Sequence, residues 1–192
     1  MDKSLCSEEI LNLWQEFVKS GRLPTGHLHP VVQASWQRCH DWGVNPHNGH
    51  SDNVLEPQEL KRVIKEHEQL ISIALPLMQQ LNQYVVGSGF LVILTDERGF
   101  ILEILGDPEA MPKAQHLNFI KGANWSEKAV GTNAIGTAIY EGIPVTVSGP
   151  EHYCQKNHVL TCSAAPIFDC DRKMIGVLDM SAPSTATHKH TL

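Results

Sequence analysis

The sequence predicts an α+β fold: an antiparallel sheet flanked by helices, preceded by an N-terminal helical extension. Two pairs of apolar runs with turn residues between them predict the sheet, and helix-type segments lie before and between the pairs. A length of 192 residues, with 42% hydrophobic and 19% charged residues, suits one globular domain with an appendage. We therefore expect a helical segment over residues 1–56 and the sheet-containing domain over residues 57–192.

Two short helices are expected within the first 50 residues. The apolar stripe of the first consists of Ile10, Leu13, Trp14, Phe17 and Val18. Gly21 suits its end, Pro30 suits the first turn of the second helix, and Gly43 suits the position just past it. Such short helices are marginal in isolation, so we expect this segment to pack on another part of the chain.

A long amphipathic helix is expected over residues 57–85, where apolar residues recur at alternating spacings of four and three. At 1.5 Å per residue its length is about 42 Å, and Pro76 is expected to kink it. Its apolar stripe is wider than one small domain needs, so it predicts a homodimer. The predicted interface residues are Ile64, Ile71, Met78 and Leu81. The alternative is that the helix packs entirely within one chain.

Five strands are expected. Residues 90–94 and 100–105 form one hairpin, residues 164–168 and 174–180 form a second, and residues 144–148 supply a fifth strand.

Short helices fill the space between the two hairpins. Ser126 can cap one that ends at Gly131, and Thr132 or Asn133 can cap another that ends at Gly142.

Charge and composition exclude several functions. The net charge is −6, and the parts before and after residue 85 each carry −3 without a basic stripe, so we expect this chain not to grip DNA. No window of about 18 apolar residues predicts a membrane span, and the N-terminus does not read as a signal peptide. The odd number of five cysteines is typical of reduced thiols, so we expect a cytoplasmic protein.

The stretch at 124–138 is the richest in side-chain donors and small residues, gathered around two helix starts. Helix N-termini and hydroxyl groups make good contacts to polar ligands. Neither the GxxxxGK nor the GxGxxG spacing is present, so the stretch is not a phosphate loop. The alternative is a capped helix packed closely on a sheet through Gly131 and Gly136.

His152, Cys154, His158 and Cys162 are residue types that bind zinc or iron, but their spacing is not a paired-ligand zinc pattern. A nucleophile and base pair, Cys154 or Cys162 with His152, is conceivable, yet no carboxylate is placed to orient the histidine. We therefore assign no metal, no cofactor and no catalytic residue. The alternative for this stretch is a polar helix that leads into a buried strand at Cys162.

Several motifs together resemble one family. They are WSEKAVGTNAIGTA at 125–138, PVTV at 144–147, EHY at 151–153, CSAAPI at 162–167, GVLD at 176–179 and SWQRC at 35–39. Over roughly residues 30–183 the chain resembles the sensory GAF domain of bacterial sigma-54-dependent transcriptional activators, in the branch that controls acetoin catabolism and the glycerol/dihydroxyacetone operon.

The resemblance implies a GAF-like antiparallel central sheet with helices on one side and a ligand cavity on the other. It implies a sensory fragment, not an enzyme, followed in the whole protein by an AAA+ ATPase and a helix-turn-helix module through which alone DNA is bound. The alternatives are a GAF-type enzyme similar to methionine sulfoxide reductase, and a metal or redox sensor.

We expect the sensory pocket between residues 124–137 and the strand that begins at Cys162. The candidate ligand-binding residues are Asn124, Trp125, Glu127, Thr132, Asn133, Thr137, His152, Tyr153 and Cys162. An aromatic wall, amides and an imidazole that titrates near neutrality suit a small hydroxy-ketone, such as acetoin or dihydroxyacetone. The resemblance also implies a protein signal, a subunit of dihydroxyacetone kinase. The alternative is that Trp125 and His152 only hold the loops.

Overall fold

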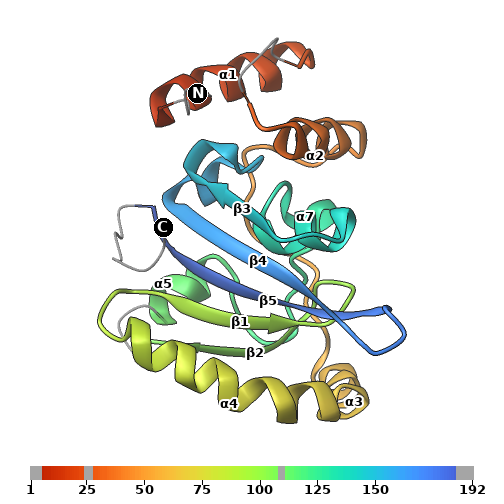
Figure 1. Ribbon diagram of the computed structural model, residues 1–192. Helices are drawn as coiled ribbons and strands as arrows, with labels where there is room; N and C mark the ends of the chain where they lie inside the picture. The colour runs from red at the N-terminus through yellow and green to blue at the C-terminus, as the bar shows by residue number, and fades with distance from the viewer. Residues whose placement is uncertain (1–5, 24–27, 108–110, 185–192) are drawn as a thin grey trace.

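The computed structural model describes residues 6–23, 28–107 and 111–184 and has a five-stranded sheet at its centre (Figure 1). The strands are β1 Leu91–Thr95, β2 Ile101–Gly106, β3 Val145–Ser148, β4 Leu160–Phe168 and β5 Met174–Pro183. Their order is β2-β1-β5-β4-β3, and every neighbouring pair is antiparallel. The predicted α+β class and both hairpins are confirmed, and β5 lies at the centre of the sheet.

Helices α3 (Pro57–Glu66) and α4 (Glu68–Val85) cover the β1–β2 half of one face, which we call the outer face (Figure 1). One helix kinked at Pro76 was expected, but the break falls at His67, and Pro76 lies inside α4. At the break, a ring nitrogen of His67 lies 2.8 Å from the Val63 carbonyl and the other lies 3.2 Å from Glu97. The backbone N–H of His67 still donates to the Val63 carbonyl at 3.1 Å, so the break is a local change of backbone angle at His67, where φ is −106°.

Most of the predicted dimer seam faces the sheet of its own chain. Met78 is fully buried, and Ile71 and Leu81 pack with it against Val92 and Leu94. Ile64 is half-buried. The exposed apolar residues of α4 are instead Ile73, Leu77 and Tyr84, which are 62%, 56% and 76% exposed.

The opposite face, the inner face, is covered by α6 (Glu127–Val130), α7 (Ala134–Glu141) and the segment around Trp125. The helix starts predicted at Ser126 and Asn133 are confirmed. Gly136 allows close packing here, because a Cβ at this position would lie 2.5 Å from the Glu127 backbone nitrogen. Three further short helices are α5 Met111–His116, η1 Gly149–Glu151 and η2 Gln155–Val159, the last two in place of the polar helix considered around His152.

The N-terminal helices α1 (Ser7–Ser20) and α2 (Pro30–Asp41) lie beyond the β3 edge, at the opposite end of the molecule from α4 (Figure 1). Gly21 ends α1 in the left-handed conformation, as expected. Trp14, Phe17 and Trp36 form a buried cluster with Tyr153 of the sheet domain, so the segment packs on the rest of the chain. The division at residue 56 stays a prediction, and the polar tail from residue 185 lies outside the described residues.

No helix in the described part of the chain has both the length and the apolar character that a membrane span requires.

Candidate functional site

A buried carboxylate, that of Glu127, joins α2 to the inner-face helices. Its Oε1 accepts hydrogen bonds from the hydroxyls of Ser35 at 2.6 Å and Thr137 at 2.9 Å. Arg38 donates to both of its oxygens, from Nε at 2.9 Å and from Nη2 at 2.8 Å. This bidentate, charge-assisted arrangement fixes direction as well as distance. Glu127 is therefore fully engaged within the chain.

Ser35 and Arg38 extend the same network. The Ser35 hydroxyl lies 2.7 Å from that of Thr132, and Arg38 also donates to Glu141 at 2.8 Å. Burial lowers the pKa of Arg38, but hydrogen bonds and charges from Glu127 and Glu141 raise it overall. The guanidinium lies 3.7 Å from the centre of the Tyr140 ring. Residues 35–39 and 127–141, two segments far apart in the sequence, thus form one junction.

Two indole groups fasten the N-terminal helices to the segment after β3. The Trp36 N–H donates to the Glu151 carbonyl at 2.6 Å, and the Trp14 N–H donates to the Tyr153 carbonyl at 2.8 Å. Phe17 stacks on Trp36 with ring centres 5.5 Å apart. Burial raises the pKa of Tyr153 to about 12. Tyr153, a predicted ligand residue, thus contacts the N-terminal helices.

Asn133 and Asn124 satisfy backbone groups near their own positions. Asn133 caps α7 by accepting from the Gly136 N–H at 2.9 Å and donates to the Gly131 carbonyl at 2.8 Å. Asn124 donates to the Arg98 carbonyl at 3.0 Å and accepts from a backbone N–H at 3.0 Å. These bonds account for the polar groups that were expected to meet a ligand.

Trp125 stacks on Phe119 with ring centres 3.7 Å apart, and its N–H donates to the Asn118 carbonyl at 3.1 Å. His152 is fully buried, and its Nδ1 lies 3.0 Å from the Gly149 carbonyl. Burial lowers the pKa of His152 to about 4, so the expectation that it titrates near neutrality is wrong. Its Nε2 has no hydrogen-bond partner among the described residues.

Cys162 lies on the inner face of the sheet, where β4 and β5 place it opposite Ser181. Ser181 donates to Oδ2 of Asp179 at 2.6 Å, while Oδ1 of Asp179 has no partner within the described part of the chain. Asp179 is fully buried, and burial raises its pKa to about 7.

The nine predicted ligand residues therefore fall into separate groups. Glu127, Thr132 and Thr137 meet at the α2 junction, whereas Cys162 lies beside Ser181 and Asp179 on the sheet. The residues that the sequence reasoning missed are Ser35, Arg38 and Asp179, although all three stand in the motifs SWQRC and GVLD. The ligand assignments themselves stay predictions.

The three buried cysteines, Cys39, Cys154 and Cys162, do not have the properties of nucleophiles. Burial raises the pKa of Cys39 and Cys154 to about 12 and raises that of Cys162 well above its usual range. A thiol held in this way resists forming the reactive thiolate. This argues against the enzyme alternative based on Cys154 or Cys162.

Among the described residues, one group of three possible metal ligands lies within 4.8 Å: His67, Asp96 and Glu97. The Asp96 carboxylate already accepts two bonds from the Arg98 guanidinium, at 2.9 and 2.7 Å, besides backbone N–H groups. The cation beside it makes this carboxylate a poor metal ligand. The run at 152–162 does not form such a group in the described chain.

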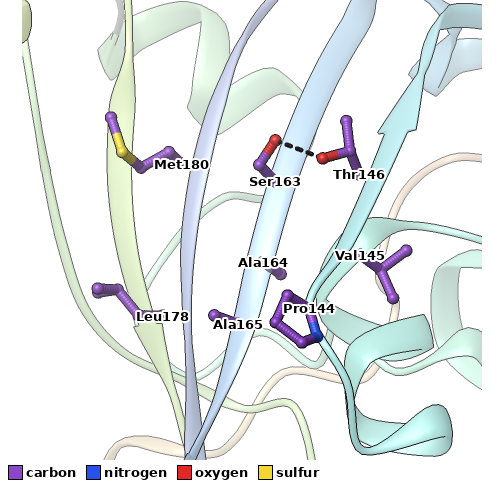
Figure 2. Close-up of a pocket in the computed structure, with 8 residues that line it drawn as sticks. All are labelled: Pro144, Val145, Thr146, Ser163, Ala164, Ala165, Leu178 and Met180. Atoms are coloured by element: carbon purple, nitrogen blue, oxygen red, sulfur yellow. Dashed lines mark hydrogen bonds between the residues drawn. The ribbon is translucent and has the colours of Figure 1, made fainter. Parts of the chain in front are cut away.

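A groove of about 310 Å³ lies on the outer face, over the strands that α4 leaves uncovered (Figure 2). It is lined by Pro144, Val145, Thr146, Ser163, Ala164, Ala165, Leu178 and Met180. Figure 2 shows the hydroxyl groups of Thr146 and Ser163 joined across the groove floor, 2.9 Å apart. The lining contains no charged side chain.

The fold matches a solved structure. In the crystal structure of the E. coli DhaR(N)–DhaL complex, the matching chain has a TM-score of 0.80 and is 20% identical, and the match covers 84% of this chain and 54% of that one. At this identity the likeness establishes the fold.

Residues 10–189 match the family described as "MimR, N-terminal domain", and the chain belongs to this family. It is 38% identical to the acetoin dehydrogenase operon transcriptional activator AcoR of Bacillus subtilis, a match that covers 95% of this chain and 30% of AcoR. It is 33% identical to the acetoin catabolism regulatory protein of Cupriavidus necator, over 79% of this chain and 23% of that protein.

It is also 27% identical to the propane 2-monooxygenase operon transcriptional activator MimR of Mycolicibacterium goodii, over 87% of this chain and 28% of MimR. The chain thus spans less than a third of the length of these activators. The predicted resemblance to activators of this branch is confirmed.

Proposed function

We propose that this chain is the signal-receiving domain of a transcriptional activator and controls an AAA+ ATPase and a DNA-binding module elsewhere in the same protein. The observation that carries the proposal is the match of residues 10–189 to the N-terminal domain of an activator family. The buried, high-pKa thiols agree with a regulatory role in place of an enzymatic one.

The proposed signal is a small uncharged hydroxy-ketone. Two of the matched relatives, at 38% and 33% identity, are named as regulators of acetoin operons, and acetoin is such a molecule. A subunit of dihydroxyacetone kinase is the second candidate, because the structural match with TM-score 0.80 was crystallised as a complex with DhaL.

A chimera tests the proposal. Residues 1–192 replace the matching N-terminal part of B. subtilis AcoR, and a reporter is placed under the acetoin dehydrogenase operon promoter. We expect reporter output that depends on an added signal, with acetoin and dihydroxyacetone each supplied alone and DhaL co-expressed in a third strain. AcoR lacking its N-terminal part is the control. A chimera whose output equals that of the truncated control under every condition would refute the proposal.

We also propose that the domain forms a homodimer through α4 and the adjoining groove. From residue 69 to residue 95 the chain contains no Asp, Glu, Lys or Arg, and depletion of charge is typical of interface cores. The exposed residues Ile73, Leu77 and Tyr84 form a stripe along α4. Leu70, on the same side of the helix, lies against Gly176 of β5, so the stripe adjoins the groove. The proposed interface combines the stripe and the groove, whereas the predicted seam is largely buried.

Leu77→Asp should shift the protein toward the monomer, because a carboxylate would be desolvated at the centre of this surface. We expect the dimer dissociation constant to rise at least about tenfold, measured by light scattering and analytical ultracentrifugation. Gln79→Asp is the matched control, since it adds the same charge at an exposed position on the other side of α4. A monomeric wild-type protein, or equal effects of the two variants, would contradict the proposed interface.

A further inference from the structure

The inner face of the sheet carries a row of polar side chains within its apolar core. Thr95, Asp179, Ser181 and Cys162 come from three adjacent strands, and each is at most 3% exposed. Ile93 and Ala164 stand on either side of Asp179 in the register. The row therefore lies in the middle of the sheet, beneath the helices and loops of the inner face.

Two oxygens of this row lack partners. Oδ1 of Asp179 and the Thr95 hydroxyl have no hydrogen-bond partner in the described part of the chain, whereas Oδ2 of Asp179 accepts from Ser181. Buried polar atoms are nearly always hydrogen-bonded, so each exception needs an explanation. An unpaired buried carboxylate is especially unfavourable because no water replaces its lost hydration.

The two unpartnered side chains are neighbours on the same face of the sheet. Asp179 pairs with Ile93, and Thr95 pairs with Val177, so Thr95 and Asp179 are diagonal neighbours on one face. Such neighbours lie about 7–8 Å apart. At that residue separation, one small ligand with oxygens on adjacent carbons can reach both side chains through hydrogen bonds of about 2.8 Å.

We propose that Asp179 and Thr95 anchor a small uncharged ligand that carries a hydroxyl group next to a carbonyl or a second hydroxyl. The ligand hydroxyl donates to Oδ1 of Asp179, and the Thr95 hydroxyl donates to the neighbouring ligand oxygen. The carboxylate disfavours an anionic ligand, and the apolar neighbours Ile93 and Ala164 cannot stabilise a charge on the ligand. This inference rests on the proposed function and assigns the residues that would read the signal.

Binding is measured by calorimetry on the purified chain with acetoin and dihydroxyacetone as probes. We expect Asp179→Asn to weaken binding of the responding probe at least about tenfold, because the amide loses one acceptor. Thr95→Val should weaken it severalfold without a change of shape. Asp171→Asn, in the exposed β4–β5 turn, is the matched control and should leave affinity unchanged. The thermal midpoint of Asp179→Asn should not fall at pH 7.5, which separates loss of binding from loss of fold.

Affinity within twofold of wild type for both variants, or no binding of either probe to wild type, would overturn the inference. If Asp179→Asn does not fold, Thr95→Val alone decides. The AcoR chimera separates the two proposals. A chimera that responds to a hydroxy-ketone with an unchanged half-maximal concentration after Asp179→Asn refutes the anchor and leaves the signal-receiving role intact. A chimera that never responds refutes that role, while calorimetry still tests the anchor.

Discussion

Replacing Arg38 with alanine should lower the free energy of unfolding by about 3–5 kcal/mol, since removing one partner of a buried ion pair leaves the other charge uncompensated. Arg38 is the cation that contacts both oxygens of Glu127, and the Glu127 side chain is only 2% exposed. Ser35 and Thr137 would still donate to that carboxylate, but neither neutralises it. The loss is measured by urea denaturation followed by tryptophan fluorescence.

Two controls separate the junction from ordinary surface charge. Arg62→Ala removes an exposed arginine whose contacts to Glu59 and Glu66 are 3.6 and 3.7 Å, so we expect a loss below about 1 kcal/mol. Arg38→Lys keeps the charge but not the bidentate geometry and should fall between wild type and Arg38→Ala. Equal losses for Arg38→Ala and Arg62→Ala would show that the junction does not hold α2 in place.

Local patterns in the sequence were sufficient to predict most of the fold. Apolar runs on either side of turn residues predicted both hairpins, and the cap candidates Ser126 and Thr132 or Asn133 predicted α6 and α7. The break between α3 and α4 was not predictable in this way. It occurs where His67 contacts Glu97, a residue 30 positions away, and apolar spacing carries no information about that contact.

The candidate site was harder to predict for the same reason. A sequence shows that Glu127 and Asn133 are polar residues near helix starts, but not whether their hydrogen bonds are already used within the chain. Glu127 receives two of its partners from α2, because Ser35 and Arg38 precede it in the sequence by 92 and 89 residues. Asp179 looked like one more strand residue, because an unpartnered oxygen is visible only once every neighbouring strand is in place.

The titrations of Asp179 and His152 should change the free energy of unfolding with pH in opposite directions. The pKa of His152 is lowered from 6.5 to about 4 by burial, so the unfolded chain binds more protons between these values. Its contribution to stability is present above pH 6.5 and is lost as the pH falls toward 4. The pKa of Asp179 is raised from 3.8 to about 7, so here the folded chain binds more protons, and stability falls as the pH rises from about 4 to 7.

Between pH 4 and 6.5 these two contributions to stability oppose each other. Replacing one of the two groups therefore reveals the pH dependence that the other group causes. At about 1.4 kcal/mol per pH unit, Asp179→Asn should lose about 3 kcal/mol relative to wild type on acidification from pH 6.5 to 4, since His152 then acts unopposed. His152→Asn, whose amide can still donate to the Gly149 carbonyl, should gain about 3 kcal/mol over the same interval.

Urea denaturation at half-unit pH intervals measures both effects, and comparison with wild type cancels the titration of all other carboxylates. For Asp171→Asn, at an exposed turn position, the free energy of unfolding should change with pH as it does for wild type. If the free energy of unfolding of both Asp179→Asn and His152→Asn also follows the wild-type pH dependence, neither group changes its pKa on folding. In that case water reaches Oδ1 of Asp179 and Nε2 of His152, and the unpartnered atoms are hydrated instead of awaiting a ligand. Opposite slopes would show that both atoms lie in a dry interior, the environment in which one ligand hydroxyl aimed at Asp179 discriminates most strongly.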